Sequence, residues 1–251
     1  MTANSSSDST FFGLLQALPL PAVSRYLAQQ GWDWIVLDMQ HGPLNSETAY
    51  ECIHTLRAAG AKPFVRVPVG NPSEIQKVLD LGALGVVVPM VNSKEEAQAA
   101  ADAAKYPPLG HRSKGGDLAY HYGATYTDRA NADTVLLVQI EHIDAVGCVE
   151  QILSVEGVDG CLMGQVDLAL SMGLGYRNFA DNEDHRKAVQ STVNTCRKLG
   201  KLACYNAFSV AEAQERLKQG FRGITLRSDV DWLAETTGRL LEEVRNSIGG
   251  K

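Results

Sequence analysis

Eight short apolar runs recur along the chain, and each is followed by a longer segment with apolar residues at helical spacing. The runs are apolar without strict alternation, which is typical of strands buried on both faces of a parallel sheet. The predicted strands are Phe11–Leu15, Trp34–Leu37, Phe64–Val67, Gly85–Pro89, Val135–Ile140, Gly160–Met163, Leu202–Tyr205 and Gly223–Leu226. The predicted helices are Pro21–Gln30, Ser46–Ala59, Pro72–Leu81, Lys94–Ala104, Ile143–Ser154, Glu183–Leu199, Val210–Gln219 and Asp231–Ser247.

Polar residues and glycines mark the ends of these helices. Asn71 precedes Pro72, and Ser93 is followed by Glu96 at capping-box spacing. The glycines that fall where helices should end are Gly60, Gly82, Gly200 and Gly220. A repeat of eight strand–helix units without a break in composition predicts one α/β domain, a closed (β/α)8 TIM barrel over residues 11–251. The polar, Ser-rich residues 1–10 are expected to form a disordered tail.

Composition excludes several classes of protein. The chain has 251 residues, 45% of them hydrophobic and 21% charged, and its net charge of −6 does not favour nucleic acid or an anionic membrane. No signal peptide and no apolar stretch of the roughly 18 residues that a membrane span needs is visible. Five cysteines without a Cys-x-x-Cys pair are expected to be reduced and buried, as in a cytoplasmic protein.

Two acidic residues follow apolar runs at positions where barrel enzymes build their sites. Glu141 and Asp167 each end a run predicted to be a buried strand, and the carboxyl ends of parallel strands meet at one mouth. Two such acids can hold one hard divalent cation. The alternative is that each acid caps the following helix. The surrounding residues favour the metal.

Three further polar residues belong to predicted strand ends. Asp38 and His41 follow the second strand, and a histidine held by a carboxylate is suited to act as a general base. Arg66 lies within the third apolar run and must meet an anion there. That anion is either a buried partner such as Asp38 or a substrate oxygen that gains negative charge, and the second interpretation is preferred.

The segments around the two acids offer groups for substrate binding. Gln139 lies two residues before Glu141 and therefore points to the same side of the strand. The amides of Gly164, Gln165 and Val166 are predicted to form a turn before Asp167 that binds a carboxylate.

Lysine placement argues against imine chemistry, and one long segment breaks the repeat. Lys62 and Lys201 fall at strand beginnings, at the wrong end of a barrel for a Schiff base. The segment Lys105–Asp133 is longer than an ordinary connection, so we expect it to select the substrate, with Arg112 and His121 as candidate contacts.

Taken together, these motifs resemble the HpcH/HpaI family of metal-dependent 2-oxoacid aldolases. The similar segments occur in family order and span nearly the whole barrel: Trp32–His41, Val65–Pro68, Val88–Val91, Tyr106–Arg112, Val138–Glu141, Gly157–Gly160 and Asp167–Gly173. Three positions depart from the family pattern. Gln40 stands where glutamate is usual, Gln165 where proline is usual, and His142 where threonine or serine is common.

The resemblance implies a function and a set of roles. Glu141 and Asp167 would bind Mg²⁺, Mn²⁺ or Co²⁺, Asp38 and His41 would form the acid/base pair, and Arg66 would stabilise an enolate. Gln139 and the amides of Gly164, Gln165 and Val166 would bind the substrate. The expected reaction is reversible aldol addition of pyruvate, or a similar 2-oxoacid such as hydroxypyruvate, to an aldehyde. His41 itself, or a metal-held water relayed by His41 and Asp38, would act as the base. The resemblance also implies a last helix that swaps between subunits, giving dimers that assemble into hexamers.

Two other functions remain open from the sequence. The same barrel can serve a CoA-ester lyase or a citrate-forming synthase, although a CoA enzyme normally carries a C-terminal extension over the thioester. A binding protein that lost turnover is disfavoured because Asp38, His41, Arg66, Glu141 and Asp167 are all present.

Overall fold

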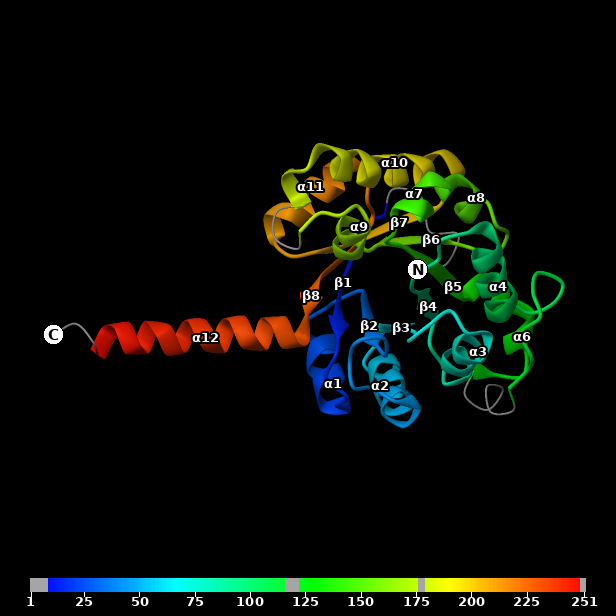
Figure 1. Ribbon diagram of the computed structural model, residues 1–251. Coiled ribbons are helices and arrows are strands. Elements are labelled where there is room, and N and C mark those ends of the chain that lie inside the picture. Colours follow the sequence, from blue (N-terminus) through cyan, green and yellow to red (C-terminus); the bar gives the residue numbers. More distant parts are fainter. Residues whose placement is uncertain (1–8, 116–121, 176–178, 249–251) are drawn as a thin grey trace.

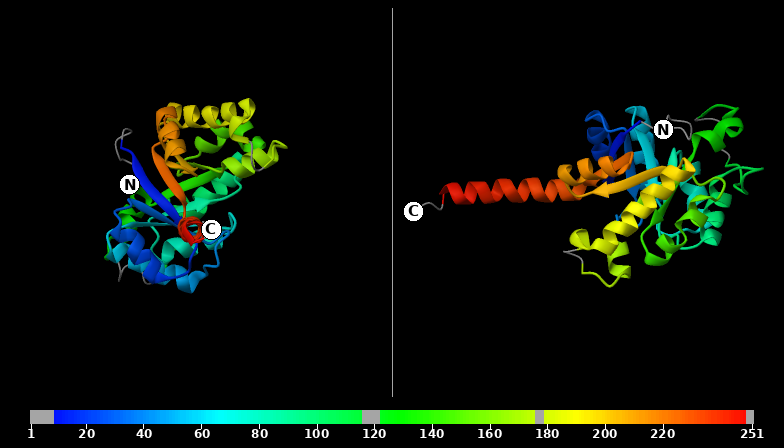
Figure 2. Two further views of the ribbon diagram at one scale, coloured as in Figure 1. Left: turned by 90° about the vertical axis from the view of Figure 1, so that its left-hand side faces the viewer. Right: turned by 90° about the horizontal axis from the view of Figure 1, so that it is seen from above.

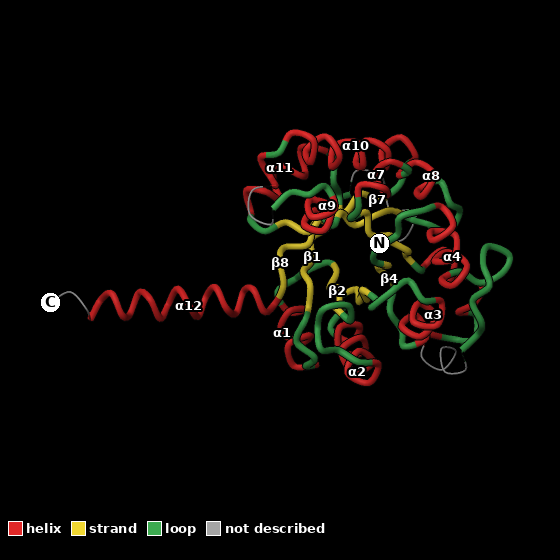
Figure 3. Tube along the Cα trace, in the orientation of Figure 1, coloured by secondary structure: helices red, strands yellow, loops and turns green. Residues whose placement is uncertain are grey.

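Eight parallel strands form a closed barrel in which each strand pairs with its neighbour in sequence and β8 pairs with β1 (Figures 1 and 3). The computed structural model describes residues 9–115, 122–175 and 179–248, so most of the predicted tail and His121 lie outside the described residues. The strands are β1 (Phe11–Gln16), β2 (Trp34–Asp38), β3 (Lys62–Arg66), β4 (Gly85–Val88), β5 (Val135–Ile140), β6 (Gly160–Met163), β7 (Leu202–Ala207) and β8 (Gly223–Ser228).

Helices surround the barrel on its outside, except the last one, which extends away from it (Figure 3). They are α1 (Pro21–Gln29), α2 (Ser46–Ala58), α3 (Pro72–Asp80), α4 (Lys94–Ala104), α6 (Tyr126–Asp133), α7 (Ile143–Gly147), α8 (Val149–Leu153), α9 (Gln165–Ser171), the 3₁₀ turn η1 (Phe179–Asp181), α10 (Glu183–Leu199), α11 (Val210–Gln219) and α12 (Asp229–Ile248). The barrel prediction is confirmed. The predicted helix Ile143–Ser154 is divided at Cys148, and α6, α9 and η1 were not predicted.

The predicted helix-end signals are present, although the Ser93–Glu96 capping box is half formed: Glu96 Oε2 accepts the N–H of Asn92 and not that of Ser93. Ser93 Oγ accepts a hydrogen bond from Glu96 N at 3.2 Å, and Asn71 Oδ1 accepts one from Ser73 N at 2.9 Å. Gly60 and Gly220 have φ angles of 84° and 114°, a left-handed conformation that glycine adopts without strain. These signals were therefore readable because each depends only on neighbouring residues.

The barrel interior is apolar in its lower part and polar at its mouth. Val36, Phe64 and Leu137 face the interior, where Trp34 packs edge-on against Phe64 with ring centroids 5.1 Å apart. Side chains two residues further along a strand face the same way. Alternation therefore turns Asp38, Arg66 and Gln139 into the mouth: β2 ends at Asp38, β3 ends at Arg66, and β5 passes through Gln139.

In the long segment that connects α4 to β5, residues 105–112 lie at the opposite end of the barrel from Asp38. The buried Lys105 Nζ donates to Asp159 Oδ2 at 3.0 Å and to Thr134 O at 2.7 Å, both just before strands. Arg112 is buried and pairs with Asp80 at 2.8 Å, at the end of α3. Within one chain, Arg112 is therefore not part of a substrate pocket at the mouth, which corrects the expectation from loop length alone.

The last helix, α12, projects away from the barrel (Figures 1 and 2). Its base is fixed, because the carboxylate of Asp229 accepts the N–H groups of Ala17 and Leu18 at 2.8 and 3.1 Å. Beyond its base the helix exposes apolar side chains at helical spacing: Leu233, Leu240, Leu241, Val244 and Ile248. None of the helices in the described part of the chain combines the length and apolar character that a bilayer crossing requires.

Candidate active site

Asp38 and Arg66 form a two-pronged ion pair at the barrel mouth. They are register neighbours on β2 and β3. Arg66 Nε donates to Asp38 Oδ1 at 3.0 Å, and Arg66 Nη2 donates to Asp38 Oδ2 at 2.7 Å. Both side chains are almost entirely buried. The anion that Arg66 needs is thus supplied by the protein, the alternative that the sequence left open. Within the described residues, Arg66 Nη1 has no protein partner and remains available to a substrate oxygen.

The Asp38 carboxylate also shapes the turn that carries His41. Its Oδ1 accepts the backbone N–H groups of Gln40 at 3.1 Å and His41 at 3.3 Å. Among the described residues, no ion pair or hydrogen bond joins the His41 ring to Asp38, so the carboxylate holds the backbone of His41 rather than its imidazole. The exposed His41 ring lines a hollow of about 400 Å³ together with Asp38 and Arg66.

Glu141 is a buried carboxylate directly after β5, with only 2% of its surface exposed. Its Oε1 accepts the N–H of Met90 at 2.7 Å, and its Oε2 accepts Gln139 Nε2 at 2.6 Å, so Gln139 and Glu141 share one side as expected. Burial raises the pKa of Glu141 to about 7; the Met90 N–H lowers it, the charge of Asp167 raises it, and the charge of Arg66 lowers it. The charges of Asp167 and Arg66 therefore act at the Glu141 carboxylate.

Asp167 lies further from its strand than the sequence indicated. β6 ends at Met163, and Asp167 is an exposed residue in the first turn of α9. β5 and β6 pair in register at Ile140 and Met163, which brings the residues after both strands to the same edge. The predicted turn before Asp167 is in fact the start of a helix: Gly164 precedes α9, and Gln165 and Val166 are its first two residues.

The alternative interpretation of the two acids as helix caps is not what the structure shows. The cap of α7 is His142, whose Nδ1 accepts the N–H of Asp144 at 3.2 Å. The residue that precedes α9 is Gly164. Asp167 still favours the amino end of α9 electrostatically, but Glu141 contacts Met90 and Gln139 instead of a helix.

Gly164 supports Glu141 by having no side chain. A Cβ at this position would lie 2.5 Å from Glu141 Cβ and 2.5 Å from Glu141 Oε2. The Gly164 N–H donates to Ile140 O at 3.0 Å, so it is not free to bind an anion as predicted. In the described part of the chain, the N–H groups of Gln165 and Val166 have no backbone acceptor and remain available.

The three positions that depart from the family pattern have distinct structural consequences. Gln165 Nε2 donates to Asn206 O at 2.6 Å, which ties α9 to β7. His142 caps α7, as described above. Gln40 Oε1 is buried and has no hydrogen-bond partner among the described residues.

The residues around Glu141 and Asp167 fit a hard divalent cation. Within the described ranges, no three His, Cys, Asp or Glu side chains gather as a metal cluster, so the protein offers two carboxylates. Mg²⁺ is commonly held by one or two carboxylates, with waters and substrate oxygens completing its shell. Gln139 Oε1, beside Glu141, is a buried oxygen without a donor in the described chain and would accept a hydrogen bond from such a water. Oxygen ligands favour Mg²⁺ or Mn²⁺ over metals that prefer thiolates.

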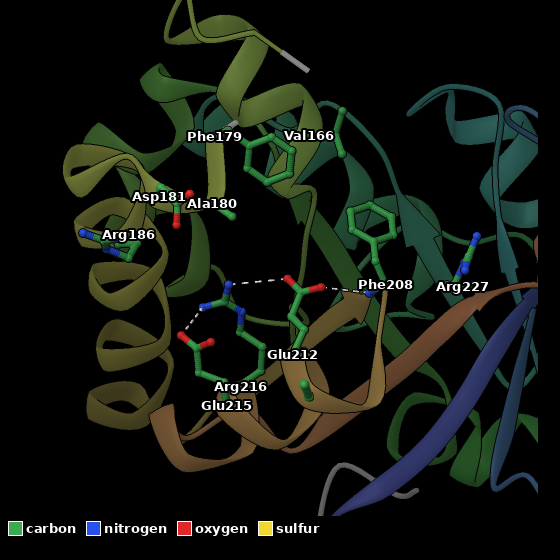
Figure 4. Close-up of a pocket in the computed structure, with 11 residues that line it drawn as sticks. Val166, Phe179, Ala180, Asp181, Arg186, Phe208, Glu212, Glu215, Arg216 and Arg227 are labelled. Atoms are coloured by element: carbon green, nitrogen blue, oxygen red, sulfur yellow. Dashed lines mark hydrogen bonds and ion pairs between the residues drawn. The ribbon is translucent and has the colours of Figure 1, made fainter. Parts of the chain in front are cut away.

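Two hollows flank β8 at the mouth. The first, which we call the mouth hollow, is the 400 Å³ space lined by Leu15, Ala17, Asp38, His41, Gly42, Pro43, Arg66, Asn206, Arg227, Ser228, Val230 and Asp231. The second, the side hollow, has about 750 Å³ and lies between α9, η1, α10 and α11; Figure 4 shows Arg227 across it from Arg186 and Asp181. Asn206 and Arg227 were missed from sequence, because neither carries a motif.

Comparisons with known proteins point to one family. Residues 12–235 match the model of the family described as HpcH/HpaI aldolase/citrate lyase. A hydroxypyruvate/pyruvate aldolase of Rhizorhabdus wittichii is 35% identical, with 93% of each chain covered. A 5-keto-4-deoxy-D-glucarate aldolase of Escherichia coli is 34% identical, over 92% of this chain and 90% of that one.

Solved structures show the same fold. A HpcH/HpaI aldolase/citrate lyase family protein from Burkholderia cenocepacia superposes with a TM-score of 0.89 at 29% identity, covering 97% of each chain. A citrate lyase β subunit from M. tuberculosis, solved with oxaloacetate and magnesium, has a TM-score of 0.61 at 15% identity, over 88% of this chain and 92% of that one. The second likeness concerns the fold alone.

The close approach of Gly164 to Glu141 gives a test of the site. Gly164→Ala should destabilise the fold by about 1–3 kcal/mol, because the added methyl group overlaps the Cβ of Glu141. It should also weaken Mn²⁺ binding, since Glu141 must move. Thermal unfolding and Mn²⁺ titration measure the two effects. Gly147→Ala is the matched control, because a Cβ there meets nothing within 4 Å. Equal behaviour of the two variants would contradict the supporting role of Gly164.

Proposed function

This chain belongs to the HpcH/HpaI aldolase/citrate lyase family and is a carbon–carbon lyase, and from that premise we propose that it joins pyruvate, or a similar 2-oxoacid such as hydroxypyruvate, to an aldehyde in a reversible, divalent-metal-dependent aldol reaction. The observation that carries the proposal is the buried Glu141 carboxylate, held by Gln139 at the mouth where the Asp38–Arg66 pair also lies. The residues after β5 and β6 reach the same edge of the barrel, which places Asp167 on this side as well. An acid, its neighbouring acid and a guanidinium in one place suit a substrate with a keto and a carboxylate group.

Glu141 and Asp167 would hold the cation, which would be Mg²⁺, Mn²⁺ or Co²⁺. When bound, it supplies Lewis acidity to the keto group of the oxoacid and so acidifies the neighbouring C–H. The N–H groups of Gln165 and Val166 bind the substrate carboxylate at the start of α9. Gln139 holds Glu141 in place through its Nε2 donor.

Arg66 stabilises the negative charge that develops on the keto oxygen. Two of its nitrogens are fixed by Asp38, so the guanidinium keeps one orientation, and Nη1 is left without a protein partner among the described residues. Asp38 therefore acts by positioning Arg66 and the backbone of His41. This differs from its expected role of holding the His41 ring.

His41 is the base in this proposal. It takes a proton from the carbon next to the keto group, and that carbon then bonds to the carbonyl carbon of the aldehyde. The aldehyde oxygen receives a proton and becomes a hydroxyl group. In cleavage, His41 takes the proton from that hydroxyl, the carbon–carbon bond breaks, and the aldehyde leaves. The carbon next to the keto group then takes the proton back from His41, which restores the oxoacid and the base.

The second candidate is a citrate-forming synthase or CoA-ester lyase on the same barrel. It would share the proton-transfer step and differ in the electrophile. The relatives named as aldolases favour an aldehyde as the electrophile.

The first test of this function is hydrogen exchange at the pyruvate methyl group. With Mg²⁺ in D₂O, NMR should show exchange that a chelator stops. Arg66→Lys should slow it about 100-fold or more while the protein stays folded, because lysine keeps the charge and loses the paired geometry. Arg186→Lys, in the side hollow, is the matched control.

The alternatives predict other results in the same assay. No exchange with Mg²⁺, Mn²⁺ or Co²⁺ would contradict the proposal and indicate a binding protein. Exchange without release of pyruvate from 4-hydroxy-2-oxoacids would indicate a synthase or CoA-ester lyase.

The raised pKa of Glu141 predicts how metal binding depends on pH. Below about pH 7 the carboxyl is protonated, and the cation must displace that proton. The Mn²⁺ dissociation constant should therefore rise about tenfold per pH unit as pH falls below 7, and level off above it. Calorimetric titrations between pH 5.5 and 8.5 measure this, with Glu150→Gln on the surface as the control. An affinity that stays constant from pH 5.5 to 7 would disprove the assignment.

We also infer that α12 docks on a second copy of the chain, in swapped dimers that assemble into hexamers. Its apolar face is exposed, and no element of the described chain covers it. The fixed base at Asp229 sets the direction in which the helix leaves the barrel. An exposed apolar stripe of this length is typical of an interface between subunits.

This assembly predicts an effect of charge on the apolar face of α12. The double variant Leu240→Glu, Val244→Glu should reduce the mass found by light scattering to that of a monomer, because two charges would be buried at the interface. Asn246→Glu lies on the opposite face and should leave the mass unchanged. A monomeric wild type would contradict the inference.

A further inference from the structure

Arg227 has a backbone conformation that glycine favours. Its φ is 55°, and Met90 is the only other described residue besides glycine with a positive φ. The residue lies near the end of β8, where the pairing with β1 shifts in register between Gly13 and Leu15. A residue other than glycine is strained in this backbone conformation, and such strained residues cluster at functional sites.

The visible contacts of Arg227 do not explain this position. It forms an ion pair with Glu235 and lies 3.9 Å from Asp231, both on α12. The Glu235 side chain is 57% exposed, and ion pairs at such a surface add little to stability. An arginine that serves only this pair would be better placed on unstrained backbone.

The position of Arg227 at the mouth suggests a second task. It is the one described residue that lines both the mouth hollow and the side hollow. In the mouth hollow it shares the space with His41 and Arg66, the groups that handle the new carbon–carbon bond. Figure 4 shows it on the β8 side, apart from the Glu212–Arg216 pairs of α11. An aldehyde that reacts beside His41 would therefore extend toward Arg227.

The charges around Arg227 favour a neutral partner rich in hydroxyl groups. Asp231, which also lines the mouth hollow, balances the guanidinium, so an anion would meet repulsion as well as attraction. Asn206 adds an amide: its Oδ1 accepts Thr225 Oγ1 at 3.0 Å, which leaves Nδ2 as a donor. Hydroxyl groups both donate and accept, and they match this mixture of donors and acceptors.

We propose that Arg227, together with Asn206, forms the part of the site that recognises the aldehyde, and that it selects neutral aldehydes carrying a hydroxyl group next to the carbonyl. The inference rests on the proposed aldol reaction and adds the class of acceptor to it. Arg227 is thus a specificity-determining residue.

The test compares two aldehydes of equal carbon number with pyruvate and Mg²⁺. Glyceraldehyde carries hydroxyl groups and propanal has none. The wild type should favour glyceraldehyde at least tenfold in kcat/KM. Arg227→Gly should reduce this preference at least fivefold, mainly through KM, with most of the loss in glyceraldehyde. Glycine accepts the positive φ, so this variant should fold, and Arg227→Met checks that the effect comes from the guanidinium.

Matched controls separate recognition from a structural role. Glu235→Gln removes the ion pair but keeps the guanidinium, and Arg186→Met changes an arginine of the side hollow only. Both should keep the wild-type preference. An equal loss in Glu235→Gln and Arg227→Gly, or no loss in Arg227→Gly, would overturn the proposal.

Two further outcomes are also decisive. A wild type that prefers succinic semialdehyde over glyceraldehyde, with the preference removed by Arg227→Gly, would overturn the neutral class. Pyruvate methyl exchange is measured in parallel, and it does not need an aldehyde. Exchange with no preference between the aldehydes would refute this inference alone, whereas absence of exchange would refute the aldol function itself.

Discussion

In a closed barrel of parallel strands, the last inward-facing side chain of every strand points into the same end of the barrel, its mouth. Strand alternation buries Val36, Phe64 and Leu137 in the barrel interior. Two residues further along the same strands, it brings the polar side chains of Asp38, Arg66 and Gln139 together at the mouth. Polar side chains that are buried there lose their hydrogen bonds to water, so each needs a hydrogen-bond or ion-pair partner in the protein. Arg66 finds Asp38, and Gln139 finds Glu141. Every functional conclusion above depends on this crowding of polar groups on apolar layers.

The crowding makes one carboxylate unusual. Glu141 is buried, accepts two hydrogen bonds, and yet has a pKa raised to about 7 because burial outweighs those bonds. A cation beside such a carboxylate would offset the free-energy cost of burying its negative charge. In the proposed function the ion would compensate the buried charge at this position, and Gly164 leaves the room that the carboxylate needs.

Much of this arrangement was readable from the sequence, for physical reasons. Strand and helix periods and helix-end signals are local, so the eight units and the ends at Gly60 and Gly220 were predicted correctly. The barrel then fixes which strand ends meet. The contacts of individual groups were not readable, because they depend on rotamers and on distant residues. Asp38 was expected to hold the His41 ring and instead binds Arg66 and backbone N–H groups. The left-handed conformation of Arg227 has no sequence signal at all. Arg112 was expected near the substrate and instead lies away from the mouth, because its segment follows a helix and precedes a strand, and such connections lie at the opposite end of a barrel.

The proposed aldol reaction requires Glu141 and Asp167 to share one divalent cation. Crystals grown with Mn²⁺ and the pyruvate analogue oxamate, measured at a wavelength where manganese scatters anomalously, test it directly. We expect one anomalous peak at the mouth, within about 2.0–2.4 Å of a carboxylate oxygen of each residue. A fully occupied peak elsewhere, or none at the mouth under saturating Mn²⁺, would contradict it.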